Sequence, residues 1–371
     1  MSKIEQYKSD LISILKVVVC RDGTAIPANA DWNKIWDFAK RNHLEAIVYT
    51  AAPKECKLLF ENEYFKMVVR TVRQTHLLEQ IEQALSNASI HYGLQKGSIL
   101  KLDYPDPCFR FMSDIDLYIR PEDRASIRTA MESIGGVFSG TESGDKQFRF
   151  SEGLGIEFHG RLLYRKTSRG IENYPDWSLL DEGKNRLTEE GYALNLIGHA
   201  VSDLSKCGPG IRYILDLWVY RHRHKPQPDW DEVWKRLRQD GIADAAKNLL
   251  DLSEYLFADG EKTAIMEELA EYVLAGGLYG DAGRAAATEA ARHGGKGKAV
   301  LRQVFRNRVE FENRYPWLRE RPCLLPLAWG LRIGNSLRRH SGKISSWGRE
   351  LKAVSRHEIQ EQKERLTRFG L

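Results

Sequence analysis

Hydrophobic and polar positions follow a helical rhythm over the first 90 residues of the chain. Between residues 57 and 88, apolar side chains recur every three or four positions; they are Leu58, Phe65, Val69, Val72, Leu77, Leu78, Ile81 and Leu85. This spacing predicts a long helix with one buried face. Asp31 is the type of residue that caps a helix N-terminus, so a second helix is expected to follow it. Residues 1–90 are therefore expected to form an N-terminal helical region.

The pattern changes near His91, where short apolar runs alternate with Gly, Pro and Asp. These runs predict strands over residues 91–96, 115–120, 147–151 and 154–162, with a helix over 122–134. The turn at Glu152–Gly153 is expected to join the last two strands as a hairpin. Helices before and after these strands indicate an α+β fold built around a small mixed β-sheet.

From Leu187 the helical rhythm returns. Helices are expected over residues 187–205, 210–224, 229–239, 242–258 and 261–275, followed by a charged helix over 345–369. The expected organisation is an N-terminal helical region (1–90), a core (91–185), a C-terminal helical domain (186–340) and a charged C-terminal helix (341–371). No apolar run approaches the ~18–20 residues of a membrane span. The five cysteines show no CxxC spacing, and the first residues lack the apolar stretch of a signal peptide, so a cytoplasmic protein is expected.

Charge is concentrated at the C-terminus. The net charge is +5, and residues 331–371 contain ten Lys and Arg against four Glu, so the rest of the chain is nearly neutral. The bulk of the protein is therefore not a basic surface for nucleic acid. The default expectation for the tail is an exposed helix whose charges pair with each other, and the alternative is weak contact with a polyanion or a membrane surface. The basic run Arg221–Lys225 is expected to be a solvated helix end.

The segment 96–120, KGSILKLDYPDPCFRFMSDIDLYIR, contains the candidate chemistry. Alternate side chains on a strand share a face, so Asp114 and Asp116 point the same way while Ile115 and Leu117 point into the core. Adjacent carboxylates repel each other, and a divalent cation such as Mg²⁺ removes that cost. A solvated acid pair is the alternative interpretation.

Three neighbouring features favour a phosphate-binding site over that alternative. The Gly97–Ser98 turn would let backbone amides and a hydroxyl approach phosphate closely. Arg110 and Lys96 would neutralise a triphosphate. Glu157, with His159 on the same strand face, would supply a third carboxylate. Taken singly, each feature also has an ordinary structural interpretation: a strand-ending turn, surface cations, or a Glu–His pair facing water.

This combination resembles the nucleotidyltransferase superfamily that includes DNA polymerase beta. It is more closely similar to a family of uncharacterised bacterial nucleotidyltransferases. The residues that carry the resemblance are Lys96–Gly97, Tyr104–Pro105, Arg110, Asp114–Leu117 and Glu157–His159, with weaker matches at His199, Arg212, Asp216, Trp230 and Asn313–Trp329. The resemblance spans roughly residues 35–340.

The resemblance implies a Mg²⁺-dependent enzyme that moves a nucleoside monophosphate from an NTP to an unidentified acceptor. It implies metal ligands at Asp114 and Asp116, and at Glu157 a second-metal ligand or general base. It also implies phosphate contacts at Gly97 and Ser98 and support for the leaving pyrophosphate from Arg110, with Lys96 as a further candidate.

Two more residues are candidate substrate contacts. His159 would orient Glu157 or touch the substrate, and a purely structural role is the alternative. Arg212 would reach a phosphate or carboxylate from the helical domain. The alternative for Arg212 is an ion pair with Asp216, which lies four residues further along the same predicted helix.

Two other classes of function stay open at this point. One is a catalytically dormant nucleotide-binding or protein-interaction module on the same fold, such as the antitoxin-like half of a pair. The other takes Asp-x-Asp as the metal site of a glycosyltransferase, but the chain lacks a long alternation of strands and helices before the motif. The sequence leaves the acceptor, the preferred base and the oligomeric state undetermined.

Overall fold

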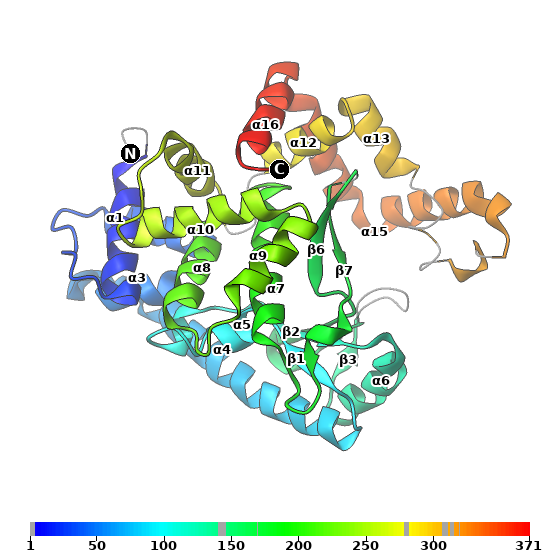
Figure 1. Cartoon of the computed structure of the whole chain (residues 1–371), viewed down its shortest axis with the longest axis horizontal. Coiled ribbons are helices and arrows are strands. Elements are labelled where there is room, and N and C mark those ends of the chain that lie inside the picture. The colour runs from blue at the N-terminus through cyan, green and yellow to red at the C-terminus, as the bar shows by residue number, and fades with distance from the viewer. Residues whose placement is uncertain are drawn as a thin grey trace.

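The computed structural model describes residues 4–139, 146–168, 170–277, 282–305, 311, 315–318 and 320–371 (Figure 1). It has the expected α+β fold, a small mixed sheet among many helices. The helices are α1 (Gln6–Leu15), α2 (Trp32–Asn42), α3 (Glu45–Ala51), α4 (Lys54–Asn87), α5 (Gly97–Leu100), α6 (Arg124–Ser133), α7 (Glu189–Leu204), α8 (Ile211–Arg223), α9 (Trp230–Gln239), α10 (Ala243–Phe257), α11 (Ala264–Ala275), α12 (Ala282–Arg292), α13 (Lys296–Val304), α15 (Leu325–Ala353) and α16 (Arg356–Arg368). The strands are β1 (Tyr92–Leu94), β2 (Ile115–Ile119), β3 (Val137–Phe138), β4 (Lys146–Arg149), β5 (Gly155–His159), β6 (Leu163–Thr167), β7 (Gly170–Tyr174), β8 (Leu180–Asp181) and β9 (Arg186–Leu187).

In the described part of the chain, the main sheet has five strands in the order β1-β2-β5-β4-β3. Strand β2 runs parallel to β5, and the other neighbours in this sheet are antiparallel. The hairpin expected at Glu152–Gly153 is present between β4 and β5. The parallel register places Asp116 of β2 directly beside Glu157 of β5.

The two faces of the sheet have different partners. Ile115, Leu117 and Ile119 of β2 are buried in a core shared with α4 and α6. Tyr118, which points the opposite way, belongs to the larger core built by the N-terminal helices and by α7, α8 and α10. Figure 1 shows α4 along one side of the sheet and α7 on the other. Asp116 shares the face of Tyr118, so the acidic face of the sheet looks toward the C-terminal helices.

The N-terminal helices begin largely where the sequence predicts. Asp31 caps α2 by accepting a hydrogen bond from the backbone N–H of Lys34 at 3.1 Å. On the long helix α4, the predicted buried residues are wrong for the first half, where Phe60 and Met67 are buried in the larger core instead. The second half is buried against the sheet, whereas these apolar side chains of the first half are exposed: Leu58, Phe65, Val69 and Val72. The apolar rhythm extends further along the helix than the sheet that covers it.

Several strand boundaries differ from the predictions. The strand expected over 154–162 ends at His159, and a separate strand, β6, follows and pairs with β7. The hairpins β6–β7 and β8–β9 were not predicted, because they are short and rich in polar residues and so lack the apolar alternation that marks a half-buried strand.

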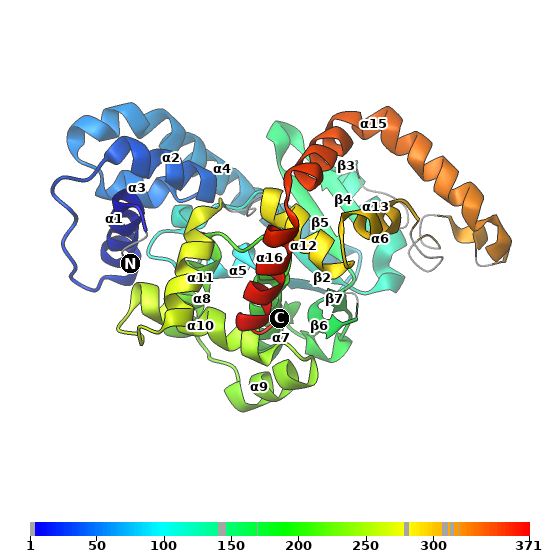
Figure 2. The same cartoon turned by 90° about the horizontal axis from the view of Figure 1, so that it is seen from above.

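The C-terminal segment forms two helices where the sequence analysis expected one over 345–369. Helix α16 begins after Ser355, whose hydroxyl and the side chain of Glu358 form a reciprocal capping box. The Ser-x-x-Glu pattern is typical of a helix N-terminus, and it explains why a new helix begins here. Arg365 and Arg368 of α16 form ion pairs with Glu268 of α11, and Figure 2 shows α16 beside α12. Among the described helices, none combines the length and apolar character that crossing a membrane requires.

The basic run Arg221–Lys225 is not a uniformly solvated helix end. His224 is only 8% exposed, and its ring lies between Asp103 and Glu189, with N–O distances of 2.8 and 3.0 Å. Carboxylates only accept hydrogen bonds, so an imidazolium that donates from both nitrogens fits this position best. Burial alone would lower the pKa of His224, but the hydrogen bonds to Asp103 and Glu189 raise it above its usual value.

This clamp is expected to make stability depend on pH. A raised pKa in the folded state stabilises the protein fully below the unfolded value, ~6.5, and the effect disappears as pH rises through the folded value. His224→Gln is therefore expected to lower the free energy of unfolding by about 1.5–3 kcal/mol at pH 6 and by less at pH 9. Urea denaturation at both pH values measures the difference. His222→Gln is the control, because His222 is 43% exposed. A loss from His224→Gln that is equal at both pH values would contradict the charged clamp.

Candidate active site

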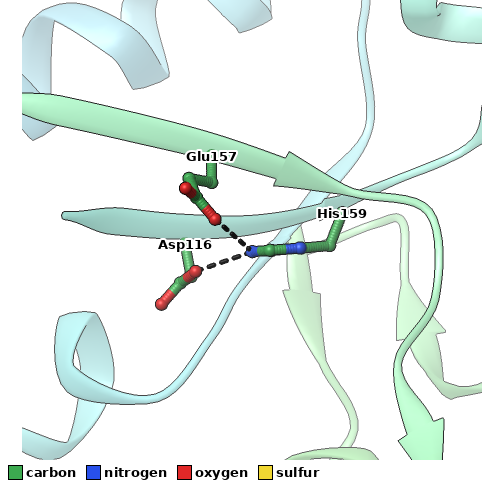
Figure 3. A group of neighbouring side chains, drawn as sticks. All are labelled: Asp116, Glu157 and His159. Atoms are coloured by element: carbon green, nitrogen blue, oxygen red, sulfur yellow. Dashed lines mark hydrogen bonds and ion pairs between the residues drawn. The ribbon is translucent and has the colours of Figure 1, made fainter. Parts of the chain in front are cut away.

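Asp116, Glu157 and His159 form a compact group on the face of the sheet that looks toward the C-terminal helices (Figure 3). His159 Nε2 lies 2.6 Å from Asp116 Oδ1 and 3.7 Å from Glu157 Oε2. One ligand atom from each residue can be chosen so that all three lie within 4.8 Å of one another. The parallel pairing of β2 with β5 produces this proximity, since the group comes from adjacent strands.

Lys96 neutralises Asp116 from the other side. Its Nζ lies 3.1 Å from Asp116 Oδ2, and the Tyr192 hydroxyl donates to the Lys96 carbonyl at 2.8 Å. The backbone of Lys96 has φ of 46°, a conformation that non-glycine residues rarely adopt. Burial alone would raise the pKa of Asp116, but the charge of Lys96 and the hydrogen bond to His159 hold it well below its usual range. Asp116 is therefore ionised at neutral pH.

Glu157 has the opposite electrostatic environment. Burial raises its pKa, and the nearby carboxylate of Asp114 raises it further. Gln147 of β4 donates to Glu157 Oε1 at 2.6 Å. Gln147 lies opposite Glu157 because of the observed register of the β4–β5 hairpin, which a two-residue turn at Glu152–Gly153 would have shifted by one residue. The sequence therefore did not indicate Gln147 as a partner of Glu157. These neighbouring carboxylates favour a bound cation, because a cation offsets their mutual repulsion.

Asp114 precedes β2 and accepts a hydrogen bond from the Ser113 hydroxyl at 2.7 Å. The loop before it is held by α4: Arg70 donates to the carbonyls of Met112 and Ser113, and Gln74 donates to Met112 at 2.9 Å. No local pattern in the sequence links α4 to this loop. Asp114 lines the same cavity as Asp116. However, Asp114 is not part of the compact group, whose third member is His159.

A cavity of about 300 Å³ lies between the sheet and helices α7 and α8. Its lining residues are Lys96, Gly97, Arg110, Met112, Ser113, Asp114, Asp116, Glu157, Leu196, His199, Asp203, Arg212 and Tyr213. Most of the candidate residues thus meet in one place. Ser98 is 3% exposed, and its hydroxyl lies 3.9 Å from the sulfur of Met112, behind Gly97. Leu196, Asp203 and Tyr213 were not anticipated, because they lie on helices far along the chain.

His199 stands on the helical wall of the cavity. Its ring nitrogens lie 3.3 Å from the hydroxyls of Tyr164 and Tyr213, and Asp203 Oδ2 lies 3.6 Å from Nε2. Burial lowers the pKa of His199 well below its usual value, and the charge of Lys96 lowers it further. The imidazole is therefore neutral at physiological pH and acts here as a hydrogen-bonding group.

Arg110 also lines the cavity, but its charge is already neutralised. Its Nε lies 2.7 Å from Asp216 Oδ1, and the Tyr104 hydroxyl donates to the same oxygen at 2.7 Å. Arg110 is 5% exposed and Asp216 is fully buried. The expected ion pair between Arg212 and Asp216 is not formed among the described residues, because Asp216 is directed toward the 102–110 loop and binds Arg110 instead.

A family model described as an uncharacterised nucleotidyltransferase matches residues 28–258. The chain belongs to this nucleotidyltransferase family. The matched segment contains every residue that lines the cavity. The match ends before α11, so it does not include the 313–329 stretch to which the resemblance was expected to extend. Residues 313, 314 and 319 of that stretch also lie outside the described residues. The chain matches no curated protein and no solved structure.

Proposed function

We propose that this protein transfers a nucleoside monophosphate from an NTP to an acceptor hydroxyl in the cavity between the sheet and α7–α8. The observation that carries the proposal is the group of Asp116, Glu157 and His159 opening onto a cavity with Lys96 and Arg212 in its wall. Family membership supports nucleotidyl transfer in general. The metal, the donor and the residue roles below are our proposals.

The donor set fits a divalent cation. Asp116 and Glu157 offer the carboxylate oxygens that Mg²⁺ prefers, with Asp114 beside them. His159 Nε2 belongs to the same group, and an imidazole suits transition metals such as Zn²⁺ or Fe²⁺ better than Mg²⁺. When bound, such a cation would neutralise phosphate charge and stabilise the leaving pyrophosphate.

The reaction itself requires a base and an anion-binding wall. The acceptor oxygen forms a new bond to the α-phosphorus, and the bond from that phosphorus to the bridging β-oxygen breaks, so its electron pair leaves with pyrophosphate. We assign the acceptor proton to Glu157, because its carboxylate lines the cavity whereas Asp116 is engaged by Lys96. Lys96 pairs with Asp116 and holds that carboxylate ionised.

Gly97 lies against the side chains of Met112 and Arg110 in the cavity wall. A Cβ at this position would lie 2.7 Å from Met112 Cγ and 3.3 Å from Arg110 Nη1. Any larger residue would therefore have to displace the Met112 side chain. We assign the backbone of Gly97 to phosphate contact, and Ser98 keeps this role as a prediction.

Isothermal titration of ATP, GTP, CTP and UTP tests the proposal, each with Mg²⁺, with Mn²⁺ and without metal. One nucleotide is expected to bind in a metal-dependent way, and Asp114→Asn/Asp116→Asn is expected to weaken binding by about 100-fold or more, equivalent to ~2.7 kcal/mol. Glu122→Gln is the control, because Glu122 is 64% exposed.

Release of pyrophosphate from the bound nucleotide, measured with candidate acceptors, completes the test. Metal-dependent binding with turnover supports nucleotidyl transfer. Tight binding without turnover would instead favour a dormant nucleotide-binding module. Absence of both binding and pyrophosphate release would contradict the proposal.

A further inference from the structure

Arg212 is a buried cation without a counter-ion. It lies on α8, is 6% exposed and lines the cavity. Its Nη1 donates to the carbonyl of Phe111 at 3.2 Å, while its buried Nε has no hydrogen-bond partner. Among the described residues, no carboxylate lies within ion-pair distance of it. A buried guanidinium in this state is costly unless a ligand supplies the negative charge.

The two acids whose charges act on Arg212, Asp216 and Glu45, form no ion pair with it among the described residues. Asp216 is bound to Arg110 and Tyr104. Burial raises the pKa of Glu45 to about 7, which leaves that carboxyl partly protonated at neutral pH. Burial, together with the charge of Arg110, lowers the pKa of Arg212 to about 10, so the guanidinium stays charged at neutral pH.

The other two cations of the cavity wall are already paired. Lys96 is bound to Asp116, and Arg110 is bound to Asp216. Arg212 is thus the cavity-lining cation, within the described residues, that is left to bind an anion from outside. The role in holding pyrophosphate that the sequence analysis assigned to Arg110 therefore fits Arg212 better.

The surroundings of Arg212 orient its guanidinium. The Phe111 carbonyl that accepts from Arg212 also accepts from Arg110 Nη1 at 2.6 Å. The Phe111 ring stacks on His43 with ring centroids 4.3 Å apart, and Arg70 packs over it. One edge of the Arg212 guanidinium is therefore held by the loop at Phe111, and the rest of this cavity-lining group has no negative partner among the described residues.

We propose that Arg212 binds the terminal phosphates of the nucleotide donor and the pyrophosphate that leaves. The identity of this anion as part of an NTP rests on the proposed function. Cavities for whole small ligands are about 300–1,000 Å³, so a volume at the lower limit suits the triphosphate better than an entire nucleotide. Guanidinium groups bind phosphate oxygens bidentately, which adds geometric specificity to charge.

The test is calorimetric binding of inorganic pyrophosphate, with and without Mg²⁺, to the full-length protein and its variants. Arg212→Gln is expected to weaken pyrophosphate binding by about 10–100-fold. Arg212→Lys is expected to weaken it by less, because a lysine keeps the positive charge but loses the paired N–H donors of the planar guanidinium. Affinity for the nucleoside monophosphates is expected to stay within about threefold, since they lack the β- and γ-phosphates. Arg223→Gln is the matched control: Arg223 lies on the same helix and donates to the backbone carbonyl of Val19, away from the cavity lining.

Thermal melting separates ligand binding from a structural role. Arg212→Gln removes a buried charge without a partner, so its melting temperature is expected to be equal to or above that of the wild type. Unchanged pyrophosphate affinity in folded Arg212→Gln, or a wild type that binds no pyrophosphate, would overturn the inference. Equal weakening of monophosphate binding would also overturn it, since the anion would then be elsewhere. Arg212-dependent pyrophosphate binding without any NTP turnover would keep the anion site and reject the proposed function.

Discussion

Asp116→Asn is expected to lower kcat/KM for nucleotidyl transfer by about 1,000-fold or more, equivalent to ~4 kcal/mol of transition-state stabilisation. Asp116 is the centre of the site, because it contacts both Lys96 and His159 and belongs to the candidate metal group. The amide keeps the shape of the side chain but removes the charge that faces Lys96 and the cation. Pyrophosphate release with the preferred NTP measures the loss.

A control must separate chemistry from folding in this experiment. Asp116 is 12% exposed and Lys96 is 19% exposed, so the substitution leaves a partly buried ammonium without its partner. Circular dichroism and thermal melting of Asp116→Asn establish whether the fold is kept. A folded variant with activity within tenfold of the wild type would contradict the assignment of Asp116 to the site.

Asp216→Ala is expected to have the largest effect on stability, a loss of about 3–5 kcal/mol. The substitution leaves Arg110 and Arg212 as two buried guanidinium groups with no carboxylate between them. It also removes the acceptor of the Tyr104 hydroxyl, and with it the contact between the 102–110 loop and α8. Urea denaturation at pH 7 measures the change.

The double variant Arg110→Met/Asp216→Leu distinguishes charge imbalance from loss of packing. Replacing both partners with apolar side chains of similar size removes the uncompensated charge, so the double variant is expected to be more stable than Asp216→Ala. Glu232→Gln, at an exposed pair with Lys235, is expected to change stability by less than about 0.5 kcal/mol. A loss below about 1 kcal/mol for Asp216→Ala would contradict this account of the buried pair.

The arginines around the cavity have different roles. Arg110 joins the 102–110 loop to α8 through Asp216, and Arg70 of α4 holds the carbonyls that precede Asp114. Both act on the position of the loop that precedes the acidic strand. Arg212 contacts the same loop only through one backbone carbonyl, so it retains donors for a ligand.

Local sequence patterns accounted for the sheet that carries the acidic residues. The apolar alternation around Asp114 and Asp116 predicted β2, and the Glu152–Gly153 turn predicted the β4–β5 hairpin. Period-two alternation then implied that Asp116 and Glu157 occupy defined strand faces. The helices between residues 187 and 275 were also predictable, because apolar residues recur there every three or four positions. Such features depend on neighbours within a few positions along the chain.

Contacts between distant segments were decided by the tertiary structure alone. The sequence by itself determined the α+β class, the acidic strand and most of the helices that pack around it. It did not determine that Asp216 binds Arg110 across 106 positions, which leaves Arg212 without its expected partner. Nor did it determine that the sheet covers only half of α4, or that His159 joins Asp116. The physical reason is that ion pairing and burial depend on which side chains packing brings together, whereas propensity and periodicity act along the chain.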